Sequence, residues 1–555
     1  MDQLGLGIYY MGSFTPRLNV LIRMVLVAGL VWFSVLLATC GPAPNSESAI
    51  SQLDRGLSGD PETLDPHRST SNQALSILRD IGEGLVSHKA DGTLEPGVAH
   101  RWEESDDHLT LTFFLRPEAR WSDGSDVIAS DFVFSFQRLV DPVTAAPYAE
   151  FVSAIVNAAE IVRGDLSPDE LGVIAVDRLT IEIQLHTPTP HFLEILAHPS
   201  TFPTNKTAFL VSGEKLFTPE KSVSNGAYVL DERVVGSSIT LRRNSLYWND
   251  RSTSIDMVTY HVVDQDVEYD RYRAGELDIT ANVPVSIFSL IRKERSSELR
   301  VAPYLGIYYY GFNLTKPPFA NNQKLRQALS IAIDRQVLVE KITGRGEIPA
   351  YTWVPPGVNN YGLENSEFEN MEREDREALA RQLFREAGYD SGDELDFELR
   401  YNTSNGHRRI ALAIQGMWRD VLGIEVKLAN EEFAVFISSV QNKQDTQVFR
   451  MSWTGDYNDA LSFLQILKSD NPSNLTAYSN SAYDDLLEQA EREADPIVRR
   501  HQLERAEQLA MANYPVIPLY FYVSNHLIHK SITGWEDNVM DVHLTKHLSM
   551  STRKN

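Results

Sequence analysis

Few residues in this 555-residue chain are of a type and spacing that could do chemistry, and none forms a catalytic pattern. An enzyme usually needs a nucleophile, a base and an orienting group, or a cofactor motif. The chain has no G-x-S-x-G elbow, no P-loop and no G-x-G-x-x-G segment, and its only cysteine is Cys40. We therefore expect no catalytic residue and no cofactor, and the sequence favours a binding protein over an enzyme.

His543 and His547 lie four residues apart, a spacing that can place two imidazoles on one helix face for a metal ion. Without a third ligand assigned beside them, a surface pair in a polar tail is the preferred interpretation. We predict no metal site.

Aromatic side chains gather in three places. Tyr and Trp suit the wall of a binding cavity because they combine apolar area with one hydrogen-bonding group, but they also pack in ordinary cores. Both interpretations stay open for these clusters, which are Tyr308 to Tyr310, Trp453 with Tyr457, and Tyr520 to Tyr522.

The composition limits the possible partners. Apolar residues make up 43% and charged residues 23% of the chain, as in an ordinary globular protein. Lys and Arg total 51 against 76 Asp and Glu, so the net charge is −25. This sign opposes binding to phosphates and to anionic lipid, so we expect no nucleic-acid partner, and membrane attachment needs another cause.

That cause lies near the N-terminus. The uncharged apolar run Met24 to Leu37 follows Arg17 and Arg23 and has the length of a signal-peptide core rather than of a membrane span. The segment ending in Cys40 looks like a bacterial lipobox, in which the cysteine is acylated after cleavage; a plain signal peptide with an incidental cysteine is the alternative. We predict a signal peptide at 1–39 and a lipid-anchored tether at 40–52.

The elements that must position a site are predicted from periodicity. Alternating apolar residues predict strands at 109–115 and 179–185, and Ser130 is predicted to cap a helix over 131–140. Strand 395–401, a helix over 407–422 ending at Gly423, and strand 424–428 form a parallel βαβ unit, which indicates an α/β fold. Further helices are predicted at 376–387, 483–491 and 496–512, and a strand at 516–527.

Many ordered segments from Leu64 to the C-terminus resemble the extracellular solute-binding proteins (family 5) of oligopeptide and dipeptide ABC importers, with oligopeptide binders matching best. They include TLDPH at 63–67, EGL at 83–85, DGTLEP at 91–96, WSDG at 121–124, DFVFS at 131–135, NGAY at 225–228, YRAGELD at 272–278, YNTS at 401–404 and WTGDY at 453–457.

The resemblance implies a two-lobed periplasmic-binding-protein fold (type II) with an extra domain on the first lobe. Lobe I would comprise residues 53–83, 204–305 and 523–555, the extra domain 84–203, and lobe II 306–522.

The resemblance also implies ligand-binding residues. In this family the aspartate of the W-x-x-D-Y segment, here Asp456, pairs with the α-amino group of the peptide. Arg450 and His407 occupy positions that serve the peptide carboxylate. Further positions near the ligand are Thr70, Asn402, Tyr309, Phe433, Trp453, Tyr457 and Tyr522.

Other basic positions of the family are replaced, with Ser330 where a lysine can occur and Gln441 where an arginine can occur. How the ligand carboxylate is anchored, and hence the preferred peptide length, therefore stays open. Backbone groups at 69–72 and 452–454 are expected to pair with the peptide main chain.

The implied function is an exported receptor, in the periplasm or cell envelope, that delivers oligopeptides to an ABC permease of the inner membrane. We expect a monomer that contacts the membrane through its N-terminal lipid. Two alternatives remain: the same fold binding a cell-wall peptide or other non-standard solute, and an envelope peptidase or hydrolase.

Overall fold

The computed structural model of the chain describes residues 50–363, 368–390, 395–443 and 446–551. The predicted signal peptide and Cys40 lie outside the described residues. Residues Ser51–Asn555 form one compact unit. In the part of the chain that is described, no helix combines the length and apolar character needed to span a membrane.

The first of three main sheets contains the start of the described chain. Its order is β1 (Gln52–Leu57), β10 (Met257–Val262), β9 (Ser238–Arg243) and β8 (Tyr228–Val234), with β1 parallel to β10 and the other pairs antiparallel. Helix α2 (Asn72–Ile81) places Leu75, Ile77 and Leu78 in the core of this sheet.

The second sheet is antiparallel in the order β4 (Ala99–Glu104), β5 (Thr110–Leu115), β7 (Thr180–Gln184) and β6 (Val173–Asp177). Strands β5 and β7 confirm the two strands predicted from alternation, and Leu111, Phe113, Ile181 and Ile183 are buried on one face. Strands β2 (Val86–His88) and β3 (Leu94–Pro96) form a hairpin that directly precedes β4 in the chain.

Helix α3 (Ala129–Val140) covers this second sheet, but its predicted cap is wrong. Ser130 lies inside the helix. Asp131 fixes the start instead, because its carboxylate accepts hydrogen bonds from the Ile128 N–H (3.2 Å) and from Trp121 Nε1 (3.0 Å). The helix therefore begins at Ala129, two residues before the predicted start.

The third sheet has six strands in the order β12 (Ile348–Pro349), β16 (Val516–Leu527), β11 (Leu299–Phe312), β15 (Val448–Thr454), β13 (Glu398–Asn402) and β14 (Lys427–Glu431). The parallel pair β13 and β14, joined by α12 (Asn405–Leu422), confirms the predicted βαβ unit. Gly423 ends the helix at a φ of 73°, which glycine adopts without strain. Strand β14 starts three residues later than predicted.

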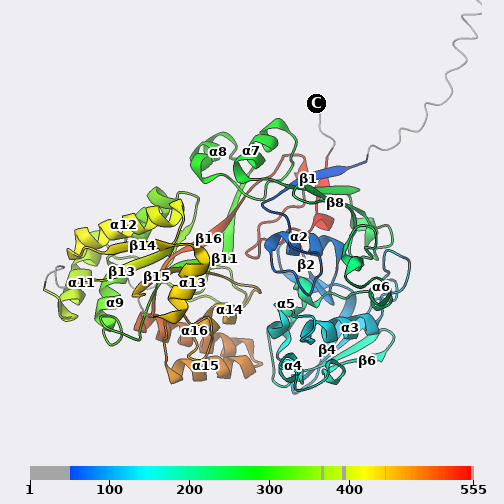
Figure 1. Cartoon of the computed structure of the whole chain (residues 1–555), viewed down its shortest axis with the longest axis horizontal. Coiled ribbons are helices and arrows are strands. Elements are labelled where there is room, and N and C mark those ends of the chain that lie inside the picture. The colour runs from blue at the N-terminus through cyan, green and yellow to red at the C-terminus, as the bar shows by residue number, and fades with distance from the viewer. Residues whose placement is uncertain (1–49, 364–367, 391–394, 444–445, 552–555) are drawn as a thin grey trace, which may run out of the picture. The chain divides into compact units, whose positions relative to one another are not determined.

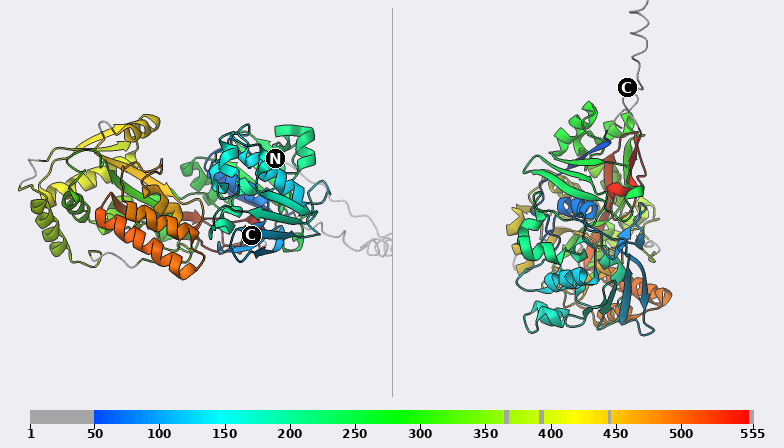
Figure 2. Two further views of the ribbon diagram at one scale, coloured as in Figure 1. Left: turned by 90° about the horizontal axis from the view of Figure 1, so that it is seen from below. Right: turned by 90° about the vertical axis from the view of Figure 1, so that its right-hand side faces the viewer.

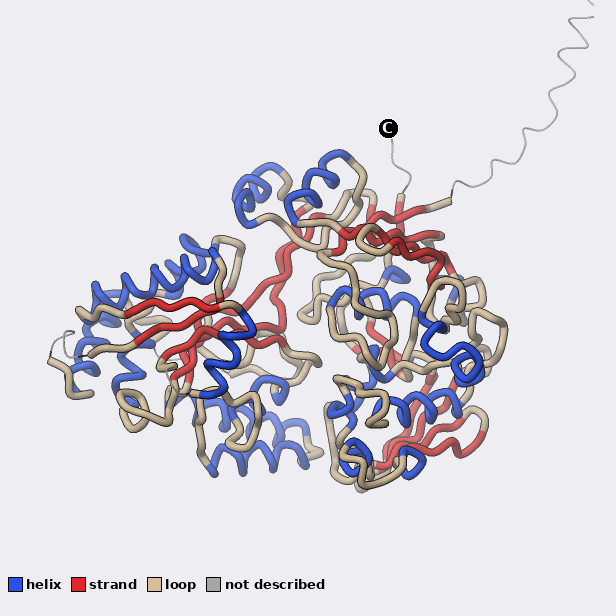
Figure 3. The backbone as a smooth tube through the Cα atoms, viewed as in Figure 1, coloured by secondary structure: helices blue, strands red, loops and turns tan. Residues whose placement is uncertain are grey.

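Helices cover both faces of this six-stranded sheet (Figures 2 and 3). One core joins Tyr308, Tyr310 and Phe312 of β11 to α9 (Gln323–Ile331), α11 (Arg373–Glu386) and α12. The other joins Leu305, Ile307 and Tyr309 to α14 (Leu461–Leu464), α15 (Ser481–Arg492) and α16 (Pro496–Asn513). The two sets alternate along β11 because successive side chains of a strand point to opposite faces.

Strands β11 and β16 are long enough to reach beyond the six-stranded sheet (Figure 1). Their far ends pair from Leu299 to Pro303 with Val523 to Leu527, after an irregularity between Pro303 and Ile307. Ile279 then bridges Ile528, just past β16, to Arg55 of β1. These strands therefore connect the third sheet to the first.

The remaining elements are short. They are α4 (Ala158–Val162), α5 (Phe192–Leu196), α6 (Lys206–Ser212), α7 (Gln265–Ala274), α8 (Phe288–Glu294), α10 (Arg335–Val337), α13 (Phe433–Asn442), β17 (Ile532–Thr533) and β18 (Ser549–Met550).

Candidate functional site

The candidate site is built around β15. This strand pairs with β11 along its whole length, from Val448 to Thr454. On its other side β13 pairs with it only at Val448 and Phe449. From Arg450 to Thr454, no strand of the described chain pairs with this second edge, so it offers backbone groups to another extended segment.

Asp456 lies two residues beyond the end of β15. The chain approaches β11 and α14 closely at Gly455, whose N–H donates to Leu305 O (2.9 Å) and where a Cβ would come within 2.8 Å of the Phe463 ring. Within the described residues the partly buried Asp456 carboxylate has no hydrogen bond and no ion pair. Burial without a cation raises the pKa of Asp456 to about 6.

Arg450 presents the opposite charge on β15 and is 8% exposed. Its guanidinium donates to Asn402 Oδ1 (3.2 Å), Ser452 Oγ (3.2 Å) and the Tyr522 hydroxyl (3.5 Å), and it lies 4.6 Å from the Tyr308 ring centroid. All three acceptors are neutral, and no carboxylate of the described chain forms an ion pair with Arg450. The structure therefore holds a nearly buried cation without an anion.

His407 lies next to Arg450 at the start of α12. Its Nδ1 is 3.1 Å from the Tyr308 hydroxyl. Burial, together with the positive charge of Arg450, lowers the pKa of His407 to about 4. The imidazole is therefore neutral at neutral pH, so it can donate a hydrogen bond but cannot supply a charge to a carboxylate.

A cavity of about 480 Å³ lies along this region. Ser452 and Thr454 of β15 and Tyr522 of β16 form part of its wall, and Asn72, at the start of α2, lines it as well. The cavity thus joins the two backbone segments that the sequence predicts to pair with a peptide main chain.

The other predicted positions have varied surroundings. Trp453 donates from Nε1 to Ser462 O (2.8 Å), and Tyr457 stacks on His191 with ring centroids 5.1 Å apart. Tyr309 is buried in the core with its ring edge against Trp353, so it does not form a cavity wall here. At the first position of α13, Phe433 is 57% exposed.

Thr70 lies just before α2 and is exposed. Its N–H donates to the Glu62 carboxylate (2.6 Å), and Ser71 donates to the same group. Although burial acts in the opposite direction, these hydrogen bonds lower the pKa of Glu62 to about 2. Glu62 therefore places an anion beside Thr70.

The two replaced basic positions have different surroundings. Ser330 is buried in α9, where its Oγ accepts a hydrogen bond from Arg335 Nη2 (3.0 Å). Gln441 is exposed on α13. Of the predicted positions, the structure brings four together: Arg450 donates to Asn402 and Tyr522, and His407 lies beside them through Tyr308.

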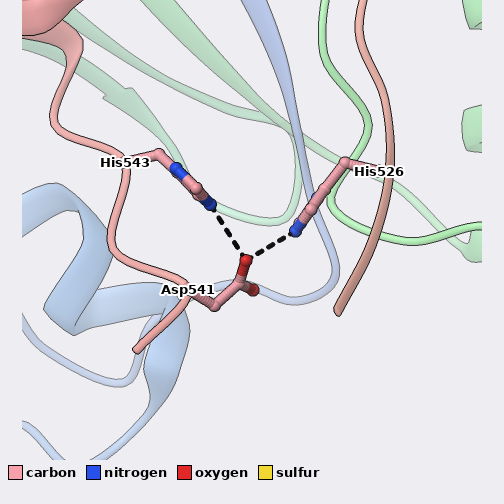
Figure 4. Close-up of side chains that lie close together, drawn as sticks. All are labelled: His526, Asp541 and His543. Atoms are coloured by element: carbon pink, nitrogen blue, oxygen red, sulfur yellow. Dashed lines mark hydrogen bonds and ion pairs between the residues drawn. The ribbon is translucent and has the colours of Figure 1, made fainter. Parts of the chain in front are cut away.

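One cluster on the cavity wall was missed by sequence reasoning. His526, Asp541 and His543 lie together (Figure 4), whereas His547 lies apart from them and donates from Nε2 to His88 O (2.9 Å). In the sequence, the spacing of four residues pairs His543 with His547 rather than with His526. No local signal connects His526, on β16, with a turn 15 residues later.

The chain is similar in sequence to known binding proteins. Residues 93–474 match the family model described as bacterial extracellular solute-binding proteins, family 5 Middle. The chain is 39% identical over 490 residues to the periplasmic murein peptide-binding protein MppA of Escherichia coli, covering 88% of this chain and 90% of that protein. It is 35% identical to the periplasmic oligopeptide-binding protein OppA of Salmonella typhimurium over 545 residues, covering 95% and 100%.

The structural comparison agrees with this. The unliganded open form of the murein tripeptide-binding protein MppA superposes with a TM-score of 0.82 at 38% identity, covering 91% of this chain and 98% of that one. These findings confirm the predicted two-lobed α/β fold. They also confirm the prediction of a binding protein rather than an enzyme, since both the family and these relatives are described as binding proteins.

Proposed function

Because the chain belongs to family 5 of the bacterial extracellular solute-binding proteins, we propose that it is the receptor of a peptide ABC importer. In this proposal it closes over an extended oligopeptide and delivers it to the membrane permease. The observation that carries the proposal is a pair of opposite, unpaired charges, Asp456 and Arg450, at the two ends of an unpaired strand edge.

Asp456 is proposed to bind the α-ammonium group of the peptide. A carboxylate that is partly removed from water gains most from a cation that enters with the ligand, since the chain supplies no cation of its own in the described residues. The raised pKa of about 6 is the signature of that missing partner.

Arg450 is proposed to bind a carboxylate of the ligand. Its Asn402, Ser452 and Tyr522 partners hold the guanidinium in place without neutralising it. A guanidinium fork matches a carboxylate in a bidentate geometry. His407, neutral and adjacent, would add one hydrogen bond to the same carboxylate rather than a second charge.

The distance between the two charges limits the peptide length. Arg450 and Asp456 are six residues apart, so at about 3.3 Å per residue their Cα atoms are at most about 20 Å apart. An extended peptide rises by the same amount per residue. Six such rises join seven Cα atoms, so we expect peptides of up to about seven residues to span both charges, with their main chain added to the free edge of β15.

A cell-wall peptide is the second candidate ligand, and the resemblance to the murein peptide-binding protein of E. coli favours it. Such a peptide also carries a free amine and additional carboxylates, so it satisfies Asp456 and Arg450 equally well. The two candidates differ in the side chains and linkages between the termini.

The remaining predictions belong to the same proposal. We propose export by the signal peptide at 1–39, acylation at Cys40, membrane contact through that lipid, and a monomeric receptor in the periplasm. We also propose the domain bounds given above, with Asn402, Tyr522, Trp453, Tyr457, Thr70 and Phe433 as secondary ligand positions.

The experiment that tests the proposal is mass spectrometry of small molecules released by denaturing the natively purified protein. A ladder of intact linear peptides supports the oligopeptide receptor. A single cell-wall peptide selects the second candidate. Recovery of only non-peptide compounds would contradict both, and cleavage of added peptides during incubation would contradict a receptor role.

A further inference from the structure

His526, Asp541 and His543 form a compact group of metal-ligating side chains. His526 Nε2 lies 2.8 Å and His543 Nε2 lies 3.0 Å from the same atom, Asp541 Oδ1. The three ligand atoms all lie within 4.8 Å of one another. Figure 4 shows the two imidazole rings approaching the carboxylate from different directions, so that all three groups converge on one point.

Neighbouring groups hold the two imidazoles in this orientation. The other ring nitrogen of His526, Nδ1, is 2.9 Å from the Thr280 carbonyl oxygen. Nδ1 therefore keeps a proton that it donates to this carbonyl, and the proton that Nε2 donates to Asp541 Oδ1 is the one that a bound cation would displace. The His543 ring stacks on Trp535 with centroids 3.5 Å apart, which fixes its plane.

Asp541 occupies a backbone conformation that favours the same arrangement. Its φ is 53°, in the left-handed region that few residues other than glycine adopt. The turn is closed by a hydrogen bond from Asp541 N–H to Asn538 O (3.1 Å). This conformation lets a single residue of a turn point its carboxylate between two histidines from different segments.

The group is also accessible. His526, Asp541 and His543 all line the cavity of about 480 Å³ that Ser452 and Thr454 border. A ligand set of three protein groups with one side open to a cavity matches the pattern of metal sites that keep a position for water or a bound solute.

We propose that His526 Nε2, Asp541 Oδ1 and His543 Nε2 bind one divalent transition cation of the zinc class. Two imidazoles and a carboxylate suit Zn²⁺, Co²⁺ or Ni²⁺, whereas Ca²⁺ and Mg²⁺ prefer ligand sets made of oxygen. The open position faces the cavity, so the cation can accept a carboxylate or carbonyl oxygen of a bound solute.

The positive charge of Arg55 lies close to this site and opposes cation binding. Its Nη1 donates to His543 O (3.1 Å) and to Thr545 Oγ1 (3.0 Å), which places a positive charge beside the ligands. One carboxylate and a neighbouring guanidinium leave little net negative charge, so we expect binding to depend on the imidazole nitrogens rather than on electrostatic attraction alone.

The test is titration of the chelator-treated full chain with Co²⁺ in the absence of peptide, followed by visible absorption spectroscopy. We expect one equivalent to bind with the d–d absorption of a nitrogen-containing, four- or five-coordinate site, and Zn²⁺ to displace it. His543→Ala and Asp541→Asn should each raise the dissociation constant at least about 10-fold, since even loss of a second-shell partner costs that much.

His501→Ala is the matched control, because the His501 side chain is 70% exposed and lies on α16, outside the cluster. His543→Gln keeps a side chain against Trp535 if the alanine variant fails to fold, as judged by circular dichroism. Failure of the wild-type chain to bind one equivalent, or binding unchanged in both His543→Gln and Asp541→Asn, overturns the proposal. Because no peptide is present, either result is independent of the peptide-receptor function.

Discussion

Asp456→Asn should weaken peptide binding but stabilise the peptide-free protein. The unpaired carboxylate attracts the ammonium group of the ligand, but its burial destabilises the empty folded state. Truncating one member of a buried charge pair costs about 2 to 5 kcal/mol of binding free energy. At 1.4 kcal/mol per tenfold, the dissociation constant of a short peptide should rise by about 30-fold to several thousand-fold.

The peptide-free variant should gain stability. Burial raises the pKa of Asp456 from 3.8 to about 6. The folded chain therefore favours the protonated carboxyl, so the ionised carboxylate destabilises it in full above about pH 6, and this cost is relieved progressively as the pH falls from about 6 to 3.8. This rise in the pKa of Asp456 corresponds to at most about 3 kcal/mol of unfolding free energy at neutral pH. Denaturant unfolding of the empty protein at pH 7.5 measures this gain.

The pH dependence of binding provides a second test of the same group. An ammonium ion binds the ionised carboxylate, so the affinity should be highest near pH 7, about tenfold weaker at pH 5, and lower again above about pH 8, where the α-amino group of the peptide loses its proton. Calorimetry of the wild-type protein should show the loss at about pH 5, and Asp456→Asn should abolish it.

Two controls accompany this assay: a peptide without a free amine and a variant at an exposed aspartate. A tripeptide with a free amine and its N-acetylated form should differ strongly in affinity for the wild type and little for Asp456→Asn. Asp470→Asn, a change at a side chain that is 78% exposed, should alter neither affinity nor stability. Equal losses for the free and acetylated peptides on Asp456→Asn would refute the assignment of Asp456 to the ammonium group.

Three other substitutions test other parts of the argument. Arg450→Gln should weaken a peptide with a free carboxylate but spare its C-terminal amide, as measured by calorimetry; an equal loss for both would make Arg450 a structural residue. His407→Gln should leave affinity within about threefold between pH 5.5 and 8, because the imidazole, with a pKa of about 4, is already neutral there; a strong pH-dependent change would show that His407 carries charge. Arg499→Ala should lower the free energy of unfolding by about 3 to 5 kcal/mol, because Arg499 contacts the buried Asp459 through two bonds of 2.7 and 2.9 Å and its loss leaves that carboxylate unpaired; a thermal melt within 1 °C of the wild type would contradict this.

The sequence predicts the local elements of this fold well because their signals are local. The strand predicted at 516–527 matches β16, and Gly423 ends α12 as predicted. The order of the six-stranded sheet is not a local property. Strand β15 lies between β11 and β13, and its free edge exists only because β13 stops pairing at Phe449.

The predicted site shows the same division. Arg450 and Asp456 lie in one segment, so a single motif could indicate both. The run Tyr308 to Tyr310 could not reveal which ring lies near Arg450, because adjacent residues of a strand face opposite sides. Tyr308 faces Arg450 and His407, whereas Tyr309 packs against Trp353. The group of His526, Asp541 and His543 depends on tertiary structure and has no motif.

The free edge of β15 would normally be a liability, because an unpaired strand can associate with the edge of another molecule. Here the unpaired length is only Arg450 to Thr454, and charged residues bound it at both ends. Arg450 and Asp456 each lack a charged partner among the described residues, so a neutral strand that docked there would leave both charges buried without compensation. A short segment that brings its own ammonium and carboxylate groups pays no such penalty. The cost of burying uncompensated charge therefore has two effects. It selects a zwitterionic peptide, and it opposes pairing with an ordinary strand.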